Sequence, residues 1–132
     1  MKTLDWETVR LFLHVLAATV WVGGQITLAA LVPALRGTAE GVTKAAAQAF
    51  NRIAWPAFGV LVLTGIWNVF ALGDQGAAFE HTLTLKYVLV VISGVTAYAH
   101  QRATSTARLA VYGALTGASA LAALFVGVWL AQ

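Results

Sequence analysis

The strongest candidates for chemistry in this chain are polar side chains that lie within long apolar runs. His14 and Lys86 each lie several residues inside such a run, and Asn68 lies near the end of another. Ionisable groups within a membrane span are costly, so they usually face the protein interior and take part in function. At about 1.5 Å per helical residue, all three fall in one layer, roughly 6–8 Å below the same membrane surface. The sequence therefore predicts a polar site where three helices meet.

His14 is the residue that we expect to bind a metal, in preference to making only a helix–helix hydrogen bond. Imidazole suits Cu(II), zinc and haem iron. The chain has no cysteine and its one methionine is Met1, so the soft ligands typical of copper transport are lacking. Lys86 or Arg10 could hold the propionates of a haem. Small residues that would leave room for a macrocycle follow His14, namely Ala17, Ala18, Gly23 and Gly24. The residues leave b-type haem and a copper ion both open.

Trp21 and Asn68 are expected to support His14 from a second layer of contacts. Trp21 follows His14 by seven residues and so shares its helix face. An indole N–H in mid-membrane also needs a hydrogen-bond partner. Lys86 has two interpretations, because its ammonium could join this site or extend to the lipid headgroups.

The other two histidines are weaker candidates. His81 is expected on the surface of an outer loop. His100 lies beside Gln101 and Arg102 at the opposite membrane edge. About 14 residues of helix, roughly 15–20 Å, separate His100 from the depth of His14, so the two histidines cannot share one ligand sphere.

The composition explains how such residues are positioned. Of 132 residues, 60% are hydrophobic and only 10% are charged, whereas a soluble domain carries about a quarter charged residues. Four runs are long enough to cross a bilayer, at about residues 9–32, 53–72, 83–99 and 109–131. Because backbone groups in lipid must satisfy their own hydrogen bonds, these runs are predicted to be helices. We predict an all-α integral membrane protein, a four-transmembrane-helix bundle in a single domain of residues 1–132.

Two further patterns concern the connections and the packing. Residues 33–51 include an alanine-rich helical pattern from Val42 to Phe50. This pattern predicts a short interfacial helix between spans 1 and 2, with Pro56 kinking the join. Gly113 and Gly117 form a G-x-x-x-G motif, which could pack inside the bundle or in a homodimer.

The charges predict the orientation. Basic residues concentrate on one side: Arg36, Lys44, Arg52, Arg102 and Arg108. The other side mixes both signs: Lys2, Arg10, Asp5, Glu7, Asp74 and Glu80. The positive-inside rule then predicts a multi-pass protein of the plasma (inner) membrane with both termini outside. The net charge of +3 is scattered between apolar runs, which indicates lipid rather than nucleic acid as the partner.

Several motifs together resemble the copper resistance protein D (CopD) family domain. The first run carries an H-x6-W-x-G-G pattern, formed by His14, Trp21, Gly23 and Gly24. Residues 50–52 and 62–67 resemble the family's next element, and Leu85-Lys86 resembles the start of its third helix. The resemblance covers roughly residues 10 to 108. It implies copper uptake or resistance.

The same arrangement is similar to the related HemJ-type protoporphyrinogen oxidases. That similarity implies a b-type haem and functional roles for His14 and Lys86. We therefore expect a metal centre in the outer half of the bundle, with His14 as ligand and Trp21, Asn68 and Lys86 around it. The expected role is copper handling or haem-linked redox chemistry. The alternative is a non-catalytic accessory subunit of a larger membrane complex, which the many small residues of the last run would favour.

Overall fold

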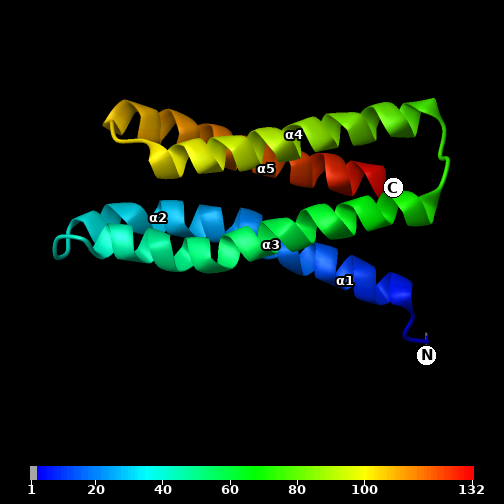
Figure 1. The fold of residues 1–132 in the computed structure, drawn as a ribbon, viewed down its shortest axis with the longest axis horizontal. Coiled ribbons are helices and arrows are strands. Elements are labelled where there is room, and N and C mark those ends of the chain that lie inside the picture. The colour runs from blue at the N-terminus through cyan, green and yellow to red at the C-terminus, as the bar shows by residue number, and fades with distance from the viewer. Residues whose placement is uncertain (1–2) are drawn as a thin grey trace. The chain divides into compact units, whose positions relative to one another are not determined.

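The computed structural model describes residues 3–132 as helices joined by short turns (Figure 1). Lys2, counted above among the outer charges, lies outside this range. The helices are α1 (Trp6–Ala18), the π-helical segment η1 (Thr19–Gly23), α2 (Gly24–Arg36), α3 (Val42–Leu72), α4 (Ala77–Arg102) and α5 (Thr106–Leu130). The chain divides into two compact units, residues 1–73 and 74–132.

Four continuous helical stretches are long and apolar enough to cross a membrane: Trp6–Arg36, Val42–Leu72, Ala77–Arg102 and Thr106–Leu130. Their large side chains point outward, with Phe70 83%, Phe125 71% and Leu63 68% exposed. The buried positions are mostly small or hydroxylated residues, as is usual where helices pack closely in lipid. The prediction of an all-helical protein with four potential spans is confirmed.

The helices are longer than the runs predicted from the sequence, and no separate interfacial helix is seen. The first span continues through Pro33 to Arg36, and Val42–Phe50 forms the opening turns of α3. The 31 residues of α3 extend about 46 Å, well beyond the roughly 30 Å of hydrocarbon. The alanine-rich turns can therefore lie at the membrane surface as part of one helix. Pro56 lies inside that helix and does not end it.

In the first unit, α1, η1 and α2 form one continuous helix that packs along α3 (Figure 1). The π-helical turn in η1 adds a residue to the helix and disturbs the regular hydrogen-bond ladder. Two threonine hydroxyls, one at its first residue and one a turn beyond it, donate to backbone carbonyls: Thr19 Oγ1 to Val15 O at 2.8 Å and Thr27 Oγ1 to Gly23 O at 2.9 Å. They supply additional donors where the ladder changes, which matters in lipid because water cannot do so.

In the second unit, α4 and α5 pack against each other through small and polar residues. Thr116 Oγ1 donates to Ser93 O at 2.8 Å, and Ser93 Oγ donates to Thr116 O at 3.1 Å. Ser93 is 1% exposed and Thr116 is 6% exposed. Hydroxyl bonds of this kind between helices replace the hydrophobic driving force that is lacking in lipid.

Candidate functional site

His14 lies between α1 and α3, where its Nδ1 is 2.8 Å from Thr64 Oγ1. The Thr64 hydroxyl also donates to Val60 O of its own helix at 2.7 Å. A hydroxyl has one proton, so when that proton is used on Val60 O the oxygen acts as acceptor towards His14. His14 Nδ1 then carries the ring proton and Nε2 carries the lone pair. This is the tautomer in which Nε2 can bind a metal while the other ring nitrogen is held in place.

Gly65 gives the imidazole its position against α3. A Cβ added at Gly65 would lie 3.5 Å from His14 Cε1, which is ordinary contact distance. The ring therefore lies directly over the backbone of the neighbouring helix. Thr64 and Gly65 together set the orientation of His14, one through a hydrogen bond and the other by its small size.

Arg10 and Asn68 lie one helical turn further towards the N-terminal end of α1. His14 faces Thr64, and α1 and α3 run in opposite directions. Arg10, four residues before His14, therefore faces Asn68, four residues after Thr64. Arg10 is only 7% exposed. Its Nε and the Asn68 Oδ1 are both buried and have no hydrogen-bond partner within residues 3–132. Buried polar atoms are normally paired, so this pair of atoms needs an explanation.

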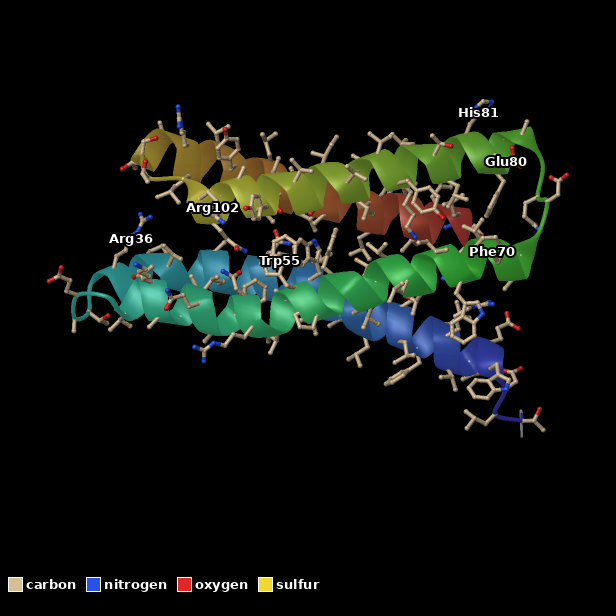
Figure 2. All side chains as sticks on the ribbon, in the orientation of Figure 1. Arg36, Trp55, Phe70, Glu80, His81 and Arg102 are labelled. Carbon is tan, nitrogen blue, oxygen red and sulfur yellow. The ribbon has the colours of Figure 1, made fainter. Side chains whose placement is uncertain are left out.

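Trp21 lies on the other side of His14, deeper along the same helix. It is 3% exposed, and its ring centroid is 4.5 Å from that of Phe58 and 5.5 Å from that of Trp55. Trp21 thus belongs to an aromatic cluster with two residues of α3, next to the π-helical turn (Trp55 is labelled in Figure 2). Its ring contacts are with α3, the helix that His14 also contacts.

Lys86 lies in the second unit and contacts α5. A Cβ added at Gly127 would lie 2.9 Å from Lys86 Nζ, so the ammonium group rests against the backbone of that glycine. The residue is half-buried. The G-x-W sequences of the two units thus have one feature in common: Gly65, two residues before Trp67, receives His14, and Gly127, two residues before Trp129, receives Lys86.

The other two histidines belong to the second unit, where each has its own setting. His100 Nδ1 donates to Leu109 O at 2.8 Å, and its ring lies against Gly113, so it links α4 to the start of α5. Gly113 is therefore used inside the chain, whereas an added Cβ at Gly117 would meet nothing within 4 Å. His81 is exposed and projects outward, but it lies in the second turn of α4 and not in a loop as expected (Figure 2).

The structure brings together some of the predicted site residues and adds others. His14 and Asn68 lie along one α1–α3 seam, with Trp21 further along it, and Lys86 belongs to the other unit. Thr64 contacts His14 but was not among the residues expected at this site. Its signal in the sequence is a Thr-Gly step within the apolar residues 62–67.

The available ligand side chains suit a haem iron better than a bare metal ion. Within residues 3–132 no group of three or more histidine, cysteine, aspartate or glutamate side chains could cage a bare ion. A haem brings four nitrogen ligands of its own and needs only one or two from the protein. A single oriented imidazole such as His14 fits that need.

Comparisons with protein-family models, with curated proteins and with solved structures find no match to this chain.

Proposed function

We propose that this chain is a haem-binding membrane protein, similar to the CopD and HemJ-type families, that acts in haem-linked redox chemistry. The observation that carries the proposal is the bond between His14 Nδ1 and Thr64 Oγ1, 2.8 Å long, between two membrane-spanning helices. It orients an imidazole with Nε2 as the basic nitrogen, which is the state required of an axial ligand. A bound b-type haem would supply reversible one-electron chemistry.

The protein's own residues would hold and tune such a centre. Thr64 keeps the proton on Nδ1, and a hydrogen bond to that proton raises the basicity of Nε2. Gly65 lets the ring lie close to α3. The aromatic cluster of Trp21, Trp55 and Phe58 excludes water from the deeper side of His14.

Lys86 is proposed to act at the same membrane depth as His14. His14 is the ninth residue of α1 and Lys86 the tenth of α4, counted from Trp6 and Ala77. Each side chain thus lies about the same number of turns into its own helix. The proposed role of the Lys86 ammonium is to neutralise an acidic group of the cofactor or substrate.

The proposed orientation is that of a plasma-membrane protein with both termini outside. The exposed basic residues next to the two connections at residues 37–41 and 103–105 would lie in the cytoplasm: Arg36, Lys44, Arg52, Arg102 and Arg108. The positive-inside rule supports this arrangement. The centre at His14 would then lie in the outer half of the membrane.

The first test is the metal content of the detergent-purified chain. We expect one haem iron per chain by the pyridine haemochrome assay, little copper by mass spectrometry, and loss of the iron in His14→Ala. His81→Ala is the matched control, because His81 is exposed and belongs to the other unit. Copper in place of iron, lost with the same variant, would instead support a copper-handling role. Iron retained by His14→Ala would contradict both.

An accessory subunit is the second candidate. It is favoured by Gly117 of α5, where an added Cβ would contact nothing within 4 Å, so another helix could approach closely there. This partner would be a second copy of the chain or a larger membrane complex. Co-purification of a partner that is lost in Gly117→Leu, with no metal in the purified chain, would support this candidate over the first.

A further inference from the structure

Arg10 is charged and buried, and the structure gives its Nε no partner. The side chain is 7% exposed, and Nε is buried without a hydrogen bond in the described part of the chain. Within a membrane helix, a buried arginine is expensive unless it is paired. The acid that interacts with it, Asp5, is fully exposed at the start of α1 and accepts hydrogen bonds from Thr8. Asp5 therefore leaves the buried side of the guanidinium unsatisfied.

Asn68 presents a second unsatisfied atom at the same level of the seam. Its Oδ1 is buried and has no partner within the described residues. The helix register places Asn68 opposite Arg10, one turn beyond Thr64. Arg10 Nε–H is a donor, and Asn68 is an amide on the facing helix. With that amide turned so that its NH2 group faces the seam, a carboxylate would accept hydrogen bonds from both side chains.

The seam between α1 and α3 therefore changes character along its length. From the membrane interior outward it holds the aromatic cluster around Trp21, then the imidazole of His14, then Arg10 with Asn68. This order matches an amphipathic ligand with an apolar body, a metal at its middle and an acidic edge. It does not match a bare copper ion, since a buried positive charge one helical turn from the ligand would repel a cation.

We infer that Arg10 and Asn68 bind a carboxylate of the porphyrin whose iron His14 ligates. The inference rests on the proposed function for the identity of the ligand. It adds the orientation of the porphyrin, whose acidic edge would lie towards the N-terminal end of α1. Arg10 is a binding residue for the acidic edge and takes no part in ligating iron.

The test measures binding of three probes to the purified chain: haemin, haemin dimethyl ester and iron-free protoporphyrin IX. Haemin is followed by its Soret band and the iron-free porphyrin by quenching of tryptophan fluorescence. We expect Arg10→Gln to weaken haemin binding roughly 10- to 100-fold, the loss typical of a hydrogen bond to a charged group. The dimethyl ester, which has no carboxylate, should bind wild type and Arg10→Gln alike. Arg10→Lys, which keeps the charge without the planar fork, should fall between them.

The controls separate this inference from the proposed function. Arg36→Gln is the matched charge control, because Arg36 is exposed at the end of α2 (Figure 2). Equal weakening of haemin and its ester by Arg10→Gln, or no weakening of either, would overturn the inference while leaving a His14-dependent Soret band intact. Arg10-dependent binding of iron-free porphyrin, with no added affinity from iron, would uphold the inference and contradict His14 ligation. Absence of binding by all three probes would overturn both.

Discussion

At the scale of single residues, the hydroxyl of Thr64 decides the chemistry of His14. When its one proton is donated to Val60 O of its own helix, its oxygen accepts from the imidazole. Thr64→Val keeps the shape and removes that acceptor. We expect haem affinity to fall 10- to 100-fold, the usual cost of losing an outer-shell partner. Thr64→Ser restores the hydroxyl and should bind haem nearly as wild type. Equal affinity of the valine and serine variants would contradict the assigned role.

Asp5 makes the start of α1 sensitive to acid. The backbone N–H and then the hydroxyl of Thr8 donate to its carboxylate, and these bonds hold the pKa of Asp5 below its ordinary value. The charged form is thus favoured in the folded helix. This contribution is complete at neutral pH and is lost as the pH falls below about 4. Hydrogen-exchange protection factors of the first turn of α1 should drop over that range.

Asp5→Asn is the control for this pH dependence. Asparagine caps helices about as well as aspartate but does not titrate. Its protection factors should stay flat between pH 7 and pH 3. A wild-type profile as flat as that of the variant would show that the carboxylate does not stabilise the helix start.

At the scale of helices, close approach of α2 to α3 depends on Gly24. A Cβ at this position would overlap the ring of Phe50, whereas one at Gly23 would meet nothing within 4 Å. We expect Gly24→Ala to destabilise the chain by about 1–3 kcal/mol, as overpacking usually does. Gly23→Ala should be neutral or stabilising by up to about 1 kcal/mol, because alanine is the better helix former. Unfolding in mixed detergents measures both, and an equal effect of the two changes would contradict the packing described.

The hydroxyl pair of Ser93 and Thr116 should couple α4 to α5. Because lipid offers no hydrophobic drive for helix association, the reciprocal bonds are expected to contribute measurably. Each hydroxyl donates to the partner's backbone carbonyl, which neither substitution removes, so Ser93→Ala and Thr116→Val should each destabilise this unit on their own. The expected loss is about 0.6 kcal/mol, the average for such bonds in membrane proteins, and at most about 1.7 kcal/mol. Unchanged stability of both variants on unfolding in mixed detergents would show that the bonds add nothing to this unit.

The sequence alone predicts the helices of this protein better than the contacts between them. Length and hydropathy were enough to predict four spans, since lipid allows little other than helices. The same constraint explains why Pro33, just beyond the predicted end of the first span, and Pro56 both lie within continuous helices. The π-helical turn at η1 has no compositional signal. His14 could be chosen by its residue type, but Thr64 could not, because its role depends on the register and rotation of α3 against α1.

At the scale of the whole molecule, the orientation in the membrane can be tested by chemical labelling. The chain has no cysteine, so single cysteines introduced at exposed connections report their side without interference. In intact cells, a membrane-impermeant maleimide should label Gln75→Cys and should leave Thr38→Cys and Thr104→Cys unlabelled until the cells are opened. The reverse pattern would place the termini and the His14 layer on the cytoplasmic side.

The most direct test of the account is the optical spectrum of purified His14→Gly with and without added imidazole. The wild-type chain should show a Soret band and α and β bands that sharpen on reduction with dithionite. The variant should lack them when haem is supplied, and free imidazole should restore them by filling the position of the lost ring. A variant spectrum identical to that of the wild type, or a featureless wild type from haem-replete cells, would contradict a haem held by His14.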